Sequence, residues 1–126
     1  MSNTVIKTTG APAPIGPYNQ AILCGNLLFI SGQIALDPKT NTLDNEDIRI
    51  ETNRVMHNLA AILSESGMGF EHVMKTTIFL TDMALFTDVN EVYAGFFTGV
   101  YPARETVAVK GLPKNVNVEI SMIASR

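Results

Sequence analysis

The chain has little of what several classes of protein depend on. It carries one cysteine, Cys24, and no tryptophan in 126 residues. A disulfide needs two thiols, so the chain cannot form one internally, which fits a reducing compartment such as the cytoplasm. No apolar run is long enough to span a bilayer, and residues 1–15 lack the apolar segment of a signal peptide. We therefore expect a cytoplasmic protein with no membrane partner.

Charge is scarce as well, and the balance is acidic. Nine Lys and Arg residues face twelve Asp and Glu residues, for a formal net charge of −3. With no basic patch or tail, nucleic acid is not an expected partner. Charged residues make up 17% of the chain, against roughly 25% in typical soluble domains, and the mean hydropathy is +0.17. This composition favours apolar surface buried between subunits, so we expect an oligomer.

The residues that are present predict one α+β domain spanning residues 1–126. Periodicity and turn residues predict strands at residues 5–6, 19–24, 27–31, 76–81, 104–110 and 116–123, and helices at residues 46–66 and from 82 or 87 to about 99. Two helices on one face of a mixed six-stranded sheet form a two-layer sandwich, whose other sheet face is open in a monomer.

The ends of the two helices also follow from the sequence. Asn45 or Asp47 is suited to cap the first helix, and Gly67 to end it. The second helix carries an aromatic and aliphatic stripe, which we interpret as its core face. The stripe consists of Phe86, Val89, Tyr93, Phe96 and Val100. Phe86, at the start of this helix, is also placed to wall a pocket.

The last two predicted strands carry two charged residues that are poor choices for a core. Alternation places Val107 and Val109 on one face of the first strand, and Arg104, Thr106 and Ala108 on the other. In the second strand, Val116, Val118 and Ile120 share a face from which Glu119 points away. We therefore expect Arg104 and Glu119 together on the open face. They are either solvated charges or a carboxylate-binding arginine with an acid/base glutamate.

Two upstream segments have a structural and a functional interpretation. Residues 11–17 contain three prolines and form a stiff loop, after which Tyr18 either anchors the loop or aims its hydroxyl into a site. Ser31 and Gly32 end a predicted strand. There the glycine either marks a bulge or lets a ligand approach the backbone.

Several of these segments together resemble the RidA family, the reactive intermediate deaminase A or YjgF-like proteins. The matching segments are Ile15-Gly16-Pro17-Tyr18-Asn19-Gln20-Ala21, Ser31-Gly32-Gln33-Ile34, Lys75-Thr76-Thr77-Ile78-Phe79-Leu80-Thr81-Asp82, Val89-Asn90-Glu91-Val92-Tyr93, Phe96-Phe97, Pro102-Ala103-Arg104, Leu112-Pro113-Lys114 and Val118-Glu119-Ile120. They cover nearly the whole chain in the family's order, so their combination is more specific than any one of them.

The resemblance implies a fold, a reaction and a site. The fold is a chorismate mutase-like trimer with the last strand inside the sheet and the sites between subunits. The reaction is hydrolysis of 2-imino or 2-enamino acids, such as 2-aminoacrylate, to 2-keto acids and ammonia, without a metal or an organic cofactor. Arg104 binds the substrate carboxylate and Glu119 handles water and protons. The remaining pocket residues are Tyr18, Ser31, Gly32, Thr106 and Phe86.

One departure from the family pattern leaves an alternative open. Many members have serine and cysteine after the arginine, whereas this chain has Glu105 and Thr106. Glu105 is expected on the face opposite Arg104, but if it turned back it would compete with a substrate carboxylate. The alternative is a non-catalytic binder or sensor of small keto or amino acids, which needs Arg104 but not Glu119. An RNA-directed role, attributed to some members, is disfavoured by the acidic pI of about 5.2.

Overall fold

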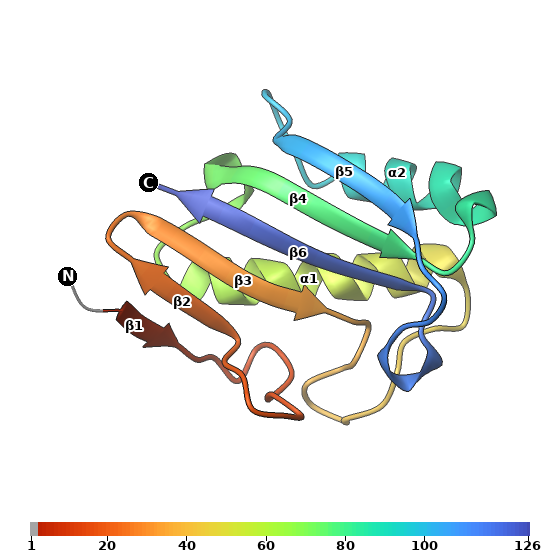
Figure 1. Ribbon diagram of the computed structural model, residues 1–126, viewed down its shortest axis with the longest axis horizontal. Coiled ribbons are helices and arrows are strands. Elements are labelled where there is room, and N and C mark those ends of the chain that lie inside the picture. Colours follow the sequence, from red (N-terminus) through yellow and green to blue (C-terminus); the bar gives the residue numbers. More distant parts are fainter. Residues whose placement is uncertain (1–2) are drawn as a thin grey trace.

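The computed structural model describes residues 3–126 as a mixed six-stranded sheet with two helices behind it (Figure 1). The elements are β1 (Asn3–Ile6), β2 (Ala21–Cys24), β3 (Leu27–Gln33), α1 (Ile48–Glu65), β4 (Val73–Leu80), α2 (Phe86–Ala94), β5 (Ala103–Ala108) and β6 (Val118–Ser125). Short 3₁₀ turns lie at Phe70–His72, Met83–Leu85 and Pro113–Asn115. The predicted two-layer α+β arrangement is confirmed.

The strand order β1-β2-β3-β6-β4-β5 places the last strand of the chain in the interior of the sheet. β6 pairs antiparallel with β3 on one side and with β4 on the other. β4 and β5 are parallel, and the connection between them contains α2, because parallel neighbours need a crossover. The last two strands therefore do not pair with each other. This order puts Glu119 inside the sheet and Arg104 on the edge strand.

The core lies between the helices and one face of the sheet. β6 alternates along its length, with Val118, Ile120, Met122 and Ala124 buried and the residues between them partly exposed. α1 supplies the matching apolar stripe through Val55, Leu59, Ile62 and Leu63, all fully buried. We call the opposite face of the sheet, which no helix covers, the uncovered face (Figure 1).

The first helix begins and ends as predicted, and the second is shorter. The Asp47 carboxylate accepts a 2.8 Å hydrogen bond from the Ile50 amide, and Gly67 follows the helix with φ of 71°. α2 ends at Ala94, because the flexible Gly95 is its C-cap. The predicted continuation to residue 99 is wrong, and Val100 is 94% exposed rather than part of the core stripe. Within residues 3–126, neither helix is long and apolar enough to cross a membrane.

The predicted position of Arg104 on the uncovered face is also wrong. β5 is paired in register with β4, so that Arg104 lies beside Thr76 and Thr106 beside Ile78. Thr76 and Ile78 are fully buried under the helices, so Arg104 and Thr106 belong to the helix-covered face. The valine that suggested otherwise, Val107, is 43% exposed on the uncovered face. Alternation tells which residues share a face, but on an edge strand it does not tell which face the helices cover.

Candidate active site

Four of the predicted site residues gather on the uncovered face around Glu119. They line a pocket of about 360 Å³, here called the Glu119 pocket. Its lining residues are Ile15, Tyr18, Ser31, Gly32, Ile34, Pro113 and Glu119. Apart from Glu119 and three polar or small residues, the wall is aliphatic, so a carboxyl group here has few polar neighbours.

The Glu119 carboxyl is packed directly against Gly32. A Cβ added at Gly32 would lie 2.9 Å from Cδ of Glu119 and closer still to Oε2, so a side chain at this position would displace the carboxyl from where it lies. Within the part of the chain that the structure describes, no group hydrogen-bonds to this carboxyl. Desolvation by burial raises its pKa above the ordinary value of 4.5. Such a group is suited to take up and release protons.

Gly32 lies in an irregularity of β3. The register between β3 and β6 shifts between Ile30 and Gln33, which places Ser31 and Gly32 in a bulge opposite β6. The bulge interpretation of this glycine is therefore confirmed, whereas the approach of a ligand to the backbone stays a prediction. The bulge is present, and the missing side chain gives another group, the Glu119 carboxyl, room to approach the backbone.

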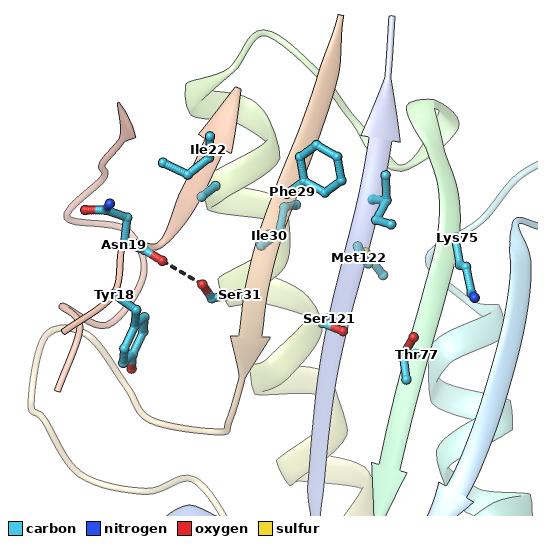
Figure 2. Close-up of a pocket in the computed structure, with 12 residues that line it drawn as sticks. Tyr18, Asn19, Ile22, Phe29, Ile30, Ser31, Lys75, Thr77, Ser121 and Met122 are labelled. Carbon is cyan, nitrogen blue, oxygen red and sulfur yellow. Dashed lines mark hydrogen bonds between the residues drawn. The ribbon is translucent and has the colours of Figure 1, made fainter. Parts of the chain in front are cut away.

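The hydroxyl groups of Tyr18 and Ser31 differ in whether they can still donate a hydrogen bond to a ligand. The Ser31 hydroxyl donates a 2.6 Å hydrogen bond to the Asn19 carbonyl, drawn in Figure 2, so only its lone pairs remain available. The Tyr18 hydroxyl accepts a 3.3 Å hydrogen bond from the Ile15 amide and keeps its own proton to donate. Tyr18 is 47% exposed and does not anchor the loop in the core.

The loop that presents Tyr18 is held by a residue that sequence analysis missed. Gln20 is buried, and its side-chain amide accepts from Thr8 N at 2.7 Å. The same amide donates to the carbonyls of Thr8, Ala11 and Pro12 at 3.0, 3.2 and 2.9 Å. The proline-rich loop is therefore tied to the start of β2. The signal in the sequence was a polar amide side chain directly before the apolar residues of β2.

Arg104 lies behind the sheet, against α2. Its guanidinium carbon is 5.2 Å from the ring centroid of Tyr93 and 5.7 Å from that of Phe86. Tyr93 is fixed in turn, since its hydroxyl donates a 2.9 Å hydrogen bond to Thr76 Oγ1. Burial raises the pKa of Tyr93, which keeps the phenol neutral. Among residues 3–126, no carboxylate forms an ion pair with Arg104.

A second pocket, of about 280 Å³, opens beside this guanidinium and is here called the Arg104 pocket. Its lining residues are Asn90, Tyr93, Ala94, Tyr101, Pro102 and Arg104. An arginine that is supported by aromatic rings and lacks an internal carboxylate partner is suited to bind a ligand carboxylate through paired hydrogen bonds. Phe86, predicted to wall the pocket, instead supports the arginine.

The two residues after Arg104 point to opposite faces, as expected. Glu105 lies on the uncovered face and forms an ion pair with Lys75 at 3.0 Å, so it does not compete for the guanidinium. Thr106 shares the face of Arg104. Its Oγ1 is buried and has no hydrogen-bond partner in the described chain.

The reactive groups of one chain are therefore not brought together. On β4, Phe79 is opposite Glu119 of β6, and Thr76 is opposite Arg104 of β5. Phe79 and Thr76 are three residues apart along β4. With strands ~4.8 Å apart and ~3.3 Å per residue, the Cα atoms of Glu119 and Arg104 are about 14 Å apart. Their side chains also point to opposite faces of the sheet. Within one chain the Glu119 pocket and the Arg104 pocket are two separate half-sites.

Beside the Glu119 pocket, with which it shares Tyr18 and Ser31, the uncovered face carries a broad pocket of about 440 Å³ (Figure 2). Ile22, Phe29 and Ile123 lie side by side across β2, β3 and β6 and give it an apolar floor. Lys75 and Thr77 on β4 add polar groups at one side. Metal ligands do not gather here or elsewhere: in residues 3–126 no three His, Cys, Asp or Glu side chains are grouped so as to hold an ion.

Comparisons with known proteins agree with this fold. Residues 8–126 match the protein family described as Endoribonuclease L-PSP. The chain is 48% identical to a RutC family protein of Synechocystis, over 98% of this chain and 97% of that protein. It is 45% identical to the chloroplastic Reactive Intermediate Deaminase A of Arabidopsis thaliana, over 96% of this chain and 65% of that protein. The solved structure of Escherichia coli TdcF with bound serine is 38% identical, covers 98% of each chain and gives a TM-score of 0.94.

Proposed function

The chain belongs to the Endoribonuclease L-PSP family, which includes RidA-type and YjgF-type proteins, and from this premise we propose that it is a hydrolytic deaminase. Its substrates are reactive 2-imino and 2-enamino acids such as 2-aminoacrylate, and its products are 2-keto acids and ammonia. The observation that carries the proposal is the Glu119 carboxyl, which is desolvated against Gly32 and has a raised pKa. A carboxyl group of this kind exchanges protons closer to neutral pH than an exposed one.

The reaction needs a carboxylate-binding group and one acid/base group. An enamine first gains a proton at its terminal carbon and loses one from its nitrogen, which gives the imine. Arg104 binds the substrate carboxylate through its planar guanidinium. Glu119 takes a proton from water as the water oxygen attacks the imine carbon, and returns that proton to the nitrogen. A second transfer, from the new hydroxyl to the nitrogen, breaks the carbon–nitrogen bond and leaves the 2-keto acid and ammonia.

We place each complete site between two copies of the chain. The carboxylate carbon and the imine carbon of the substrate are directly bonded, so Arg104 and Glu119 must act within a few ångströms of each other. In one chain they lie on opposite faces of the sheet. A homotrimer, the assembly that the family resemblance implies, joins the Arg104 pocket of one copy to the Glu119 pocket of the next around a closed ring. The apolar floor of the uncovered face supplies contact surface for such an assembly.

A second candidate function is non-catalytic binding of small amino or keto acids. It is favoured by the related TdcF, whose structure contains bound serine, an amino acid with a free carboxylate. This function uses Arg104 and its pocket, whereas the chemistry of Glu119 is not needed.

One experiment separates the two functions. A serine dehydratase generates 2-aminoacrylate in the presence of this protein, and the rate of pyruvate release is followed. The deaminase proposal predicts faster release with the wild type and none of this acceleration with Glu119→Gln, while both proteins bind a 2-keto acid equally well in calorimetry. Glu46→Gln, which changes an exposed glutamate, is the matched control. Binding without any acceleration by the wild type rejects the deaminase and supports the binder.

A further inference from the structure

Glu51 is a buried glutamate that the proposed reaction does not use. It lies in the first turn of α1, and its side chain is fully buried. Its Oε2 accepts hydrogen bonds from the amides of Asn117 and Val118 at 2.7 and 3.1 Å, and its Oε1 accepts one from Asn117 Nδ2 at 2.8 Å. A carboxylate is costly to bury unless it is hydrogen-bonded. Here all three donors come from the two residues before Glu119.

The backbone amides of Asn117 and Val118 have no neighbouring strand on the β3 side of β6. β3 and β6 are paired from Leu27 opposite Ser125 to Gln33 opposite Ile120, and no pair follows. On the other side, β4 continues alongside, and Asn117 O accepts a 3.1 Å hydrogen bond from Thr81 N. The Glu51 carboxylate therefore takes the place of β3 at the start of β6. Without it, the part-buried amide of Asn117 and the buried amide of Val118 would lose their partner.

The chain reaches this point through an irregular turn. Lys114 and Asn115 have φ of 55° and 56°, in the left-handed region that residues with a side chain seldom adopt. Pro113, in the same turn, lines the Glu119 pocket. The turn does not by itself fix where β6 begins, because regular pairing starts only after it. The contact that fixes the exit of the turn on the helix side is Glu51.

We propose that Glu51 is a positioning residue that holds the first residues of β6 in place and thereby sets the Glu119 carboxyl against Gly32. Val118 and Glu119 are consecutive in a strand, so a backbone held at Val118 on the helix side determines where Glu119 emerges on the uncovered face. The space there is narrow, as the Gly32 contact shows. A small shift of the strand start therefore moves the carboxyl off the glycine. The catalytic part of this inference rests on the proposed function.

The side chain of Asn117 allows a matched set of variants. Glu51→Ala removes the acceptor for all three donors. Glu51→Gln keeps an acceptor for both backbone amides, and its new NH₂ group can donate to Asn117 Oδ1 once the asparagine amide has rotated. Asn117→Asp places a second carboxylate against Glu51, whereas Glu51→Gln combined with Asn117→Asp restores a donor–acceptor pair. The expected order of activity is wild type, then Glu51→Gln and the double variant, then Glu51→Ala and Asn117→Asp.

Kinetics distinguish positioning from a purely structural role. We expect kcat of Glu51→Ala to fall about 10- to 100-fold, the size expected for displacing a reacting group by about an ångström. We expect KM to stay within about twofold, since the substrate carboxylate is bound by Arg104, and Glu51 bonds to Asn117 and Val118 rather than to Arg104. If Glu51→Ala only melts at a lower temperature, with an unchanged kcat per folded molecule, the positioning role is rejected. If it does not fold, Asn117→Asp and its rescue by Glu51→Gln decide instead, and failure of that rescue rejects the proposal.

A second readout does not depend on any activity. The Glu119 carboxyl is titrated by ¹³C NMR in the wild type and in the variants, and assigned by its loss in Glu119→Gln. Tyr18 is the titratable neighbour of Glu119 in the same pocket. We expect the pKa of Glu119 to move toward its ordinary value in Glu51→Ala and to stay at the wild-type value in Glu51→Gln. An unmoved pKa in Glu51→Ala overturns the inference. If the wild type does not accelerate pyruvate release, only the proposed deaminase function is rejected.

Discussion

Glu119 and Arg104 have different surroundings, yet neither charged group has a partner of opposite charge within the described chain. Glu119 lies on the uncovered face against a glycine, among aliphatic residues that offer it no hydrogen bond. Arg104 lies behind the sheet, where its guanidinium contacts two aromatic rings and forms no ion pair with a carboxylate of the described chain. By contrast, Arg54 is paired with a carboxylate of its own chain, that of Asp44, at 2.8 Å. Both candidate reactive groups are therefore held in place by contacts that leave their polar atoms available to a ligand.

Because the two half-sites are built differently, we expect different kinds of substitution to impair them. The Glu119 pocket depends on an absent side chain, so added volume damages it. The Arg104 pocket depends on a planar cation stacked on rings, so loss of planarity damages it. The predictions below test this contrast, beginning with the largest expected effect.

Replacing Arg104 is expected to have the largest effect. Arg104→Lys keeps the charge but loses the planar fork, and Arg104→Ala loses both, so kcat/KM falls by about 10²-fold or more in each. Circular dichroism and the melting temperature should stay close to those of the wild type. Arg49→Lys is the matched control, because Arg49 is an exposed arginine paired with Asp88 and Glu91. Near wild-type turnover by Arg104→Lys removes the carboxylate-binding role.

Adding one methyl group at Gly32 tests the other half-site. Gly32→Ala displaces the Glu119 carboxyl, and we expect kcat to fall by about 10- to 100-fold while the affinity for a 2-keto acid changes little. Gly111→Ala is the control, because a Cβ at Gly111 meets no atom within 4 Å. The account is contradicted if the two alanine variants have equal activity.

A charge on the uncovered face tests whether another copy covers it. Phe29 is 44% exposed on this face and Ile50 is 43% exposed on the outer side of α1. We expect only the surface around Phe29 to be buried between copies. Phe29→Asp should then lower the molecular mass measured by light scattering at micromolar concentration, and it should lower the activity by about tenfold. Ile50→Asp should change neither the mass nor the activity. A monomeric Phe29→Asp protein with full activity rejects the shared site.

The smallest expected effect concerns the stability cost of the Glu119 charge. Its pKa is raised in the folded state, so the folded protein binds this proton more tightly than the unfolded chain. Stability therefore falls as pH rises from the ordinary pKa of 4.5 through the raised one. Glu119→Gln cannot ionise, and its melting temperature at pH 7 should exceed that of the wild type by a few degrees. The difference should vanish near pH 4; a wild type that melts higher at pH 7 contradicts this.

Local signals in the sequence predicted most of the fold. Gly25 adopts φ of 61° in the predicted hairpin, and α1 begins after Asp47 and ends before Gly67 as expected. What failed depended on tertiary context. β5 is an edge strand whose one valine, Val107, lies on the exposed face, so alternation alone could not decide which side the helices cover. α2 ends five residues earlier than predicted, since Gly95 stops it.

The site was predicted unevenly for a similar reason. Tyr18, Ser31, Gly32 and Glu119 gather in one pocket as the family resemblance implied. The buried polar residues that support them, Gln20 and Glu51, were missed. Glu51 precedes Val55 by four residues and so lies on the apolar stripe of α1, which was the available signal. Its partners are more than sixty residues away in the chain, and no pattern in the sequence predicts that contact.

The central claim, that each site combines Arg104 of one copy with Glu119 of another, has a direct test by subunit mixing. Arg104→Ala and Glu119→Gln, each inactive alone, are unfolded together in equal amounts and refolded. If the site is shared, about a quarter of the sites in random mixed rings contain both native residues, and about a quarter of the wild-type activity returns. Mixing Gly32→Ala with Glu119→Gln, which damage the same half-site, should restore nothing. No recovery from the first mixture, despite mixed assemblies seen by native mass spectrometry, contradicts the shared site.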